Sequence, residues 1–287
     1  KVLFASSEAY PFAMSGGLAD VAGALPKALS AEGVDVRVVI PKYVEIPESC
    51  RTRMTHLCDF TVELGWRRQY CGIDTLAENG ITFYFIDNEY YFKRGELYGH
   101  FDDGERFAFF SRACLDAMLA IDFIPEIIQC NDWQCGLIPV YLKAVYHDRL
   151  SNTRCMYTIH NIEYQGRYGE DTVDQLFGLD RGWYNDGTVQ MDGDVNLMKA
   201  AMLVSDAVTT VSPTYAAQLH DPAYAEGMAS VVDMVGWKMH GVVNGIDTAG
   251  YDPASDPALP AHYTPEDMGG KAVCKSSLQT ALGLHQE

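Results

Sequence analysis

Short apolar runs alternate with amphipathic helical patterns along most of the chain, which is typical of an α/β fold. The first run, 2–5, precedes a stretch whose apolar residues recur at helical spacing, so that one face of a helix is expected to be buried. These residues are Leu18, Val21, Ala22, Leu25, Ala28 and Leu29. A second apolar run, 36–40, follows the turn at Gly33. Because strand–helix–strand connections are right-handed, this unit predicts a Rossmann-like parallel sheet flanked by helices.

The same alternation continues towards the C-terminus. We expect further strands over 126–130, 155–159, 207–211 and Val242-Val243, and helices over 102–121, 136–146, 196–204 and from Ser212-Pro213. Two stretches differ from this pattern. Residues 43–89 carry strand propensity at 61–64 and 81–86, which predicts a β-hairpin region inserted beside the sheet, and 164–192 is expected to form loops with short helices.

The last part of the chain changes character. Residues 252–267 contain four prolines and no hydrophobic periodicity, which is typical of an extended connector, and a polar helix is expected over 271–284. We therefore divide the chain into a domain at 1–250 and a connector with the start of an interdomain helix at 251–287. The alternative is a C-terminal tail that docks on the first domain.

Ser15, Gly16 and Gly17 lie between the first predicted strand and the first predicted helix. The first N–H groups of a helix have no partner within the helix and can bind an anion such as a phosphate. The alternative is a tight turn that needs glycine for steric reasons. This pattern alone favours neither explanation.

Polar residues also follow four later strands at their carboxyl ends, where open parallel sheets bind ligands. They are Asn131-Asp132-Trp133-Gln134, His160-Asn161, Ser212-Pro213 and Asn244-Gly245. Many hydrogen-bonding groups with little charge suit a sugar. Taken singly, each residue has a structural explanation: Asp132 as a helix N-cap, for example, and His160 as a core histidine.

Composition excludes several function classes. The net charge of -18 argues against nucleic acid and against anionic membranes as partners, but not against a neutral polymer. No apolar run approaches the roughly 20 residues that span a bilayer, and we expect a cytoplasmic protein. The eight cysteines lack zinc-site spacing, which favours buried thiols over a metal or disulfide framework. No G-x-S-x-G, H-E-x-x-H or G-x-G-x-x-G motif is present.

Seven segments together form a family pattern, in the order in which that family has them. They are SSEAYPFAMSGGLADVAGALPKAL, DNEYYFKRGELYG, DDGERFAFFSRA, CNDWQCGLIPVYLK, TIHNIEYQG, LMKAAMLVSDAVTTVSPTYA and VVNGID. The chain thereby resembles the N-terminal half of bacterial glycogen synthases and plant starch synthases, retaining glucosyltransferases with the GT-B fold.

The resemblance implies transfer of glucose from ADP-glucose to the non-reducing end of an α-1,4-glucan, with no cofactor and no catalytic metal. ADP-glucose would bind together with a C-terminal GT-B domain that this chain lacks. The resemblance assigns catalytic roles to Asp132 and His160. It assigns substrate-binding roles to Met14, Ser15, Gly16, Gly17, Asp20, Asn161 and Asn244.

Two departures from the family pattern affect these expectations. Met14 occupies the lysine position of the glycine loop, which removes a cation from the expected diphosphate site. The second departure is the expected absence of the C-terminal domain, which would supply the remaining cations. The isolated chain is therefore expected to be inactive. A non-catalytic glucan-binding or regulatory paralogue is the alternative function, and UDP-glucose is the alternative donor.

Overall fold

A computed structural model gives the structure of the chain and describes residues 1–286. Two compact units are present, Lys1–Asn244 and Gly245–Glu287. The sequence-based division was placed after residue 250. The first unit carries the main sheet and every strand-end residue named above except Gly245, and the second carries a single helix in its described part.

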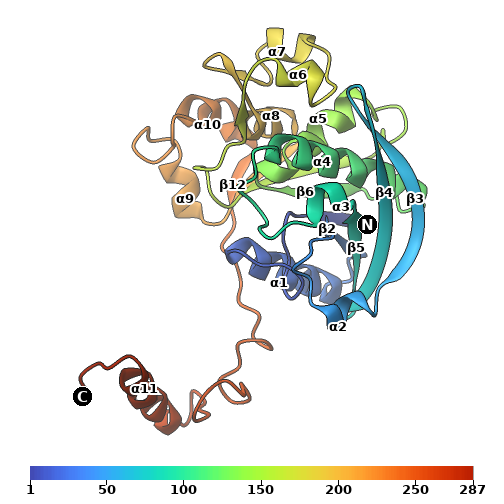
Figure 1. The fold of residues 1–287 in the computed structure, drawn as a ribbon. Helices are drawn as coiled ribbons and strands as arrows, with labels where there is room; N and C mark the ends of the chain where they lie inside the picture. The colour runs from blue at the N-terminus through green and yellow to red at the C-terminus, as the bar shows by residue number, and fades with distance from the viewer. Residues whose placement is uncertain (287) are drawn as a thin grey trace. The chain divides into compact units, whose positions relative to one another are not determined.

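The main sheet has nine strands in the order β12-β11-β7-β6-β1-β2-β5-β4-β3 (Figure 1). The first seven of these in sheet order are parallel to one another: β12 (Met239–Gly241), β11 (Ala207–Thr210), β7 (Arg154–Ile159), β6 (Ile127–Asn131), β1 (Val2–Ala5), β2 (Val36–Pro41) and β5 (Ile81–Asp87). The antiparallel hairpin β3 (Thr55–Leu64) and β4 (Arg67–Glu78) completes it. This confirms the predicted Rossmann-like class.

Helices cover both faces of this sheet. Helix α1 (Gly17–Ala31) connects β1 to β2, whereas α5 (Leu137–Ala144) and α8 (Leu197–Val204) connect strands in the opposite direction across the sheet. Because crossovers are right-handed, helices that connect strands in opposite directions lie on opposite faces of the sheet. Figure 1 shows α1 across the sheet from α4 (Asp103–Ala120), α5 and α8. Shorter helices are α2 (Glu48–Arg51), α3 (Glu89–Phe92), α6 (Thr172–Gln175), α7 (Gly182–Asn185), α9 (Pro213–Gln218) and α10 (Ala229–Val235), with 3-10 turns at Trp133–Cys135 and Gly236–Lys238.

The core forms between these layers. Leu3, Phe4 and Ala5 of the central strand β1 are buried. Phe12 packs edge-on against Phe83 of β5, with ring centroids 4.8 Å apart. Central burial of β1 fixes the position of the residues that follow it, which belong to the cavity described below.

The predicted hairpin region is observed over β3, β4 and β5. Strand β5 forms a hairpin with β4 and also pairs with β2 in parallel, as Val38 does with Phe83, so the region continues the main sheet at its edge. Strands β3 and β4 form a second hairpin, and β4 was not predicted. Its polar outer residues at 67–70 weaken the apolar alternation from which strands are recognised.

The predicted last strand at Val242-Val243 is wrong. Both valines are exposed, and the strand lies three residues earlier, where Met239 pairs with Val208 of β11. Valine has a high strand propensity, but pairing with the neighbouring strand decides the register.

The buried face of α1 differs from the predicted one. Leu18, Ala22 and Pro26 are buried, whereas Ala28 is exposed. A Cβ on Gly23 would lie 2.8 Å from the carbonyl oxygen of Tyr10. A small residue therefore faces the segment after β1, and Leu25 and Leu29 are only half-buried.

Residues 164–192 contribute to a small antiparallel sheet that was not predicted. Its strands are β8 (Arg167–Tyr168), β9 (Gln190–Met191) and β10 (Asp194–Asn196). Strands of two or three residues are too short to show a period-2 pattern, so the sequence carries no signal for them.

In the second unit, α11 (Gly269–Ala281) begins two residues before the predicted start of the helix at 271 and ends three residues before its predicted end at 284. A Cβ on Gly270 would lie 1.9 Å from the carbonyl oxygen of His262, so only glycine fits. No helix within residues 1–286 has the length and apolarity to cross a membrane. All eight cysteines are free thiols, and those at 50, 71, 114, 130, 135 and 155 are buried.

Candidate active site

A cavity of about 820 Å³ opens at the carboxyl edge of the parallel strands. Its lining follows β1, β6, β7, β11 and β12 and includes a loop before α4. The lining residues are Glu8, Ser15, Gly16, Gly17, Leu18, Tyr98, Gly99, Asp103, Asp132, Trp133, Gln134, His160, Asn161, Tyr164, Val211 and Asn244. Seven of the nine residues proposed from the sequence therefore meet at one cavity.

The glycine loop is open on the cavity side. Gly16 has φ -160° and ψ -165°, an extended conformation that any residue adopts, and a Cβ on Gly16 or Gly17 would meet no atom within 4 Å. The loop therefore does not need glycine for a tight turn. The missing side chains instead leave space at the N-terminus of α1.

Glu8 is a buried cavity residue that sequence reasoning missed. Its Oε2 accepts a hydrogen bond from the backbone N–H of Ser15 and so connects the end of β1 to the glycine loop. Burial raises the pKa of Glu8, and the N–H groups of Ser15 and Gly16 partly offset this effect. Glu8 and the glycine loop both follow β1, so its position after a strand could have identified it as a site residue.

Asp132 connects the ends of β6 and β7. Its Oδ1 accepts hydrogen bonds from the backbone N–H groups of His160, at 2.8 Å, and Asn161, at 3.4 Å. It makes no side-chain cap to the following 3-10 turn, so the N-cap explanation is wrong. Burial raises the pKa of Asp132 to about 7, and the negative charge of Glu8 adds to the effect.

The backbone of Asp132 is unusual as well. Its φ of 54° with ψ of -177° lies in a region that L-residues rarely adopt and that costs about 1–3 kcal/mol. The backbone N–H of Asp132 donates to the carbonyl oxygen of Thr158 at 3.0 Å. Strain at a residue held by neighbouring strands is typical of functional sites.

His160 is half-buried at the cavity wall. Its Nε2 lies 3.0 Å from Oδ1 of Asn131, whose Nδ2 donates to the carbonyl oxygen of Ala5 at 2.8 Å. Because Asn131 can only accept at Oδ1, Nε2 of His160 is assigned as the protonated nitrogen. Burial lowers the pKa of His160 to about 4, so the ring is neutral at pH 7.

The other predicted residues occupy different positions. Asn161 and Asn244 are exposed at the cavity wall. Met14 and Asp20 are exposed and do not belong to the lining, although each flanks the glycine loop. Ser212 caps α9, because its Oγ accepts from the N–H of Tyr215 at 3.1 Å.

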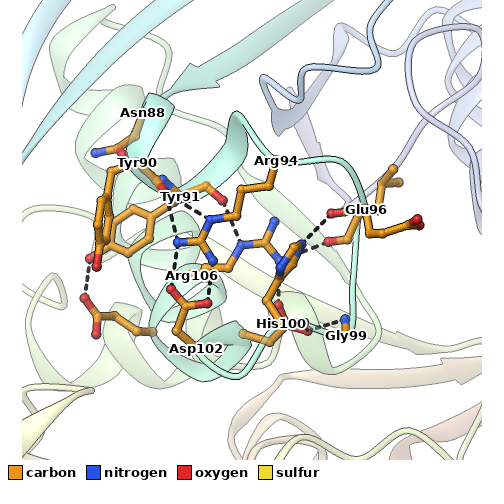
Figure 2. A network of polar contacts seen from close by, with 12 residues as sticks. Asn88, Tyr90, Tyr91, Arg94, Glu96, Gly99, His100, Asp102 and Arg106 are labelled. Carbon is orange, nitrogen blue, oxygen red and sulfur yellow. Dashed lines mark hydrogen bonds and ion pairs between the residues drawn. The ribbon is translucent and has the colours of Figure 1, made fainter.

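A loop between α3 and α4 supplies further lining residues that were not predicted. The Tyr98 hydroxyl lies 2.7 Å from Oγ of Ser7, and Oδ2 of Asp103 accepts from the N–H of Gly99 at 2.7 Å. Figure 2 shows the polar contacts that hold this loop. Because none of these residues follows a strand, the strand-end argument could not find them.

The lining carries negative and neutral groups. Glu8, Asp103 and Asp132 are its acidic residues, and within the described residues no lysine or arginine belongs to it. Hydroxyl, amide, carboxyl and backbone groups suit the hydroxyls of a sugar. They provide no counter-charge for a diphosphate.

Comparison with known proteins decides which family this cavity belongs to. The family model described as the starch synthase catalytic domain matches residues 1–234. The chain belongs to this family. It is 45% identical over its full length to glycogen synthases of Streptococcus agalactiae and Bacillus subtilis, and it spans 61% and 60% of them.

A solved structure agrees with this assignment. The catalytic domain of starch synthase IV from Arabidopsis thaliana, bound to ADP and acarbose, superposes with a TM-score of 0.91 at 33% identity. The match covers 99% of this chain and 59% of that one. The family resemblance and the GT-B fold class expected from the sequence are confirmed.

Acid should destabilise the fold through His160. Its pKa is about 4 in the folded chain and about 6.5 when unfolded, so the unfolded state binds more protons between these values. The free energy of unfolding should therefore fall by about 1–3 kcal/mol as the pH drops from 6.5 to 4. Urea unfolding of His160→Gln, which keeps a donor towards Asn131, should lack this component.

The exposed His147 provides the matched control. His147→Gln should keep the acid sensitivity of the unmodified chain. An equal acid sensitivity in His160→Gln and in the unmodified chain would contradict the neutral assignment of His160.

Proposed function

We propose that the chain is the N-terminal domain of a retaining glucosyltransferase of glycogen or starch synthesis. It acts on ADP-glucose and on the 4-hydroxyl at the non-reducing end of an α-1,4-glucan. The observation that carries the proposal is the cavity, in which the hydrogen-bonded Asp132 and His160 and the open glycine loop line one space. Family membership supports the choice of substrates.

The proposed reaction exchanges one bond at the anomeric carbon. The bond from C1 of glucose to the diphosphate oxygen breaks, and a bond from C1 to the acceptor hydroxyl forms on the same face of the ring. ADP leaves with the bonding electron pair, and the acceptor proton passes to the departing diphosphate. Positive charge develops on the glucose ring in between.

Fixed dipoles beside the ring would stabilise that charge without reorganising. Asp132 holds the backbone N–H groups of His160 and Asn161, so this segment cannot rotate away from the cavity. The second carboxyl oxygen of Asp132 is left to face a glucosyl hydroxyl. Asn161 and Asn244 add amide groups at the wall.

The diphosphate needs cations that the described lining does not supply. We infer that a C-terminal domain provides them, as the length of the relatives suggests, and that the 287-residue chain alone does not transfer glucose.

A transfer assay with ADP-glucose and glycogen should detect product with the full-length gene product only. NMR of the product should show α-linked glucose. Transfer by the 287-residue chain would overturn the division of roles, and no transfer by either protein would favour a non-catalytic glucan-binding paralogue.

Met14→Lys tests the charge at the glycine loop. A lysine here would add a charge-assisted contact worth about 1.5–3 kcal/mol to a diphosphate, which corresponds to a gain of about 10- to 100-fold in kcat/KM. The full-length variant should be assayed with ADP-glucose and with UDP-glucose, because the donor base is part of the proposal. Val44→Lys is a control at another exposed apolar position. An unchanged kcat/KM for Met14→Lys would remove Met14 from the donor site.

A further inference from the structure

Phe101 belongs to the loop that contributes to the cavity lining, and its side chain is in solvent. Its exposed fraction is 97%, the largest of the exposed hydrophobic residues in the described chain. Gly99 and Asp103, two residues away on either side, both line the cavity. Single exposed apolar residues are common, so exposure alone assigns no role. The position beside the cavity and the structure of the loop carry the argument.

The loop that presents Phe101 is held at many points. Oδ2 of Asp103 accepts from the N–H groups of Gly99 and His100, at 2.7 and 3.2 Å. On the other flank, Arg94 donates to both carboxyl oxygens of Asp102, at 2.6 and 2.8 Å. Figure 2 shows the pair of Arg94 and Asp102 together with Gly99 and His100. The residues on both sides of Phe101 are therefore fixed.

This network has a buried anchor. Arg106 has no exposed surface, and it donates to the carbonyl oxygens of Tyr91 and Leu97 at 2.8 and 3.1 Å and to Oδ1 of Asp103. An aromatic ring on so rigid a loop loses little conformational entropy when a ligand packs on it, because the backbone is ordered beforehand. The loop thus presents a preorganised apolar face next to a polar cavity.

We propose that Phe101 stacks on a glucosyl ring of the acceptor α-glucan where that chain leaves the cavity. The inference rests on the proposed function and adds an outer subsite to it. A polymer whose end occupies the cavity must cross the rim, and a pyranose ring combines an apolar face for the Phe101 ring with hydroxyls for the nearby polar groups.

Binding of maltotriose and maltoheptaose to the 287-residue chain tests the proposal by calorimetry. Phe101→Ala should weaken maltoheptaose binding about 3- to 10-fold, because one aromatic contact is lost, and should leave the Kd of maltotriose unchanged. Phe101→Tyr should restore the affinity for maltoheptaose. Arg94→Ala, which releases the loop but keeps the Phe101 ring, should also weaken the binding of maltoheptaose.

Trp237 provides a matched exposed aromatic residue. It is 80% exposed and precedes β12, so it lies at the amino ends of the parallel strands, whereas the cavity lies at their carboxyl ends. Trp237→Ala should therefore bind both sugars as the unmodified chain does. Unchanged maltoheptaose binding by Phe101→Ala, or an equal loss for both sugars, would overturn the outer subsite alone. Failure of the unmodified chain to bind either sugar would instead overturn the proposed function together with the subsite.

Discussion

Replacing Asp132 with alanine should lower kcat/KM for glucosyl transfer by the full-length enzyme about 100- to 1,000-fold. Removal of one preorganised polar group from an active site typically has this effect. The variant would lose the carboxyl group that holds the N–H groups of His160 and Asn161, together with the negative charge that we propose to face the sugar. Steady-state kinetics with varied ADP-glucose would measure the loss.

Asp132→Asn separates these two contributions, because its amide oxygen can still accept from the backbone of His160. With the pKa of Asp132 at about 7, the ionised form is lost as the pH falls through 7, and the rate of the unmodified enzyme should decline there. The Asn variant should be slower and show no such decline. A decline of the same size in both enzymes would assign the pH dependence to another group.

Asp192 is a suitable control for the backbone of Asp132. It shares a φ of 54° but is exposed and outside the cavity. Asp192→Ala should therefore change kcat/KM by less than about twofold. An equal loss in both alanine variants would point to a general effect of this backbone conformation rather than to the cavity.

Arg106→Leu should lower the free energy of unfolding by about 3–5 kcal/mol, because it leaves Asp103 buried without its ionic partner. The carbonyl oxygens of Tyr91 and Leu97 would lose a donor as well. Urea unfolding at pH 7 would measure the change. The double variant Arg106→Leu with Asp103→Leu should recover part of the loss, since it removes the unpaired charge.

Arg68 provides the comparison at the surface. Its contact with Glu63 is 3.7 Å long between two exposed side chains, so Arg68→Leu should change stability by less than about 1 kcal/mol. A loss below 1 kcal/mol in Arg106→Leu would show that water replaces the arginine and that the loop does not depend on it.

Long periodic segments of the fold could be predicted from the sequence. The helix expected over 102–121 is observed as Asp103–Ala120, and the strand expected over 155–159 as Arg154–Ile159. Both bury a continuous apolar face, so local pattern and tertiary contacts agree. At Val242-Val243 they disagree, because pairing with β11 is decided by hydrogen bonds that no single segment encodes.

The candidate site was predictable where it follows strands. The strand-end argument places Asp132 and His160 at one cavity edge, as observed. It does not reach Tyr98 or Asp103, which a loop brings in from outside the strand ends. The neutral ring of His160 also depends on burial and on Asn131, neither of which is visible before the chain is folded. The catalytic and substrate-binding roles remain predictions.

The open geometry of Gly16 makes this position suitable for a reporter group. Its extended backbone and the empty space where a Cβ would stand mean that a side chain can be installed there without displacing any neighbour. Gly16→Cys would carry a thiol-linked fluorophore at the cavity mouth, while six of the eight native cysteines are buried from the reagent. Occupancy of the cavity would then be visible as a change in emission, independently of turnover.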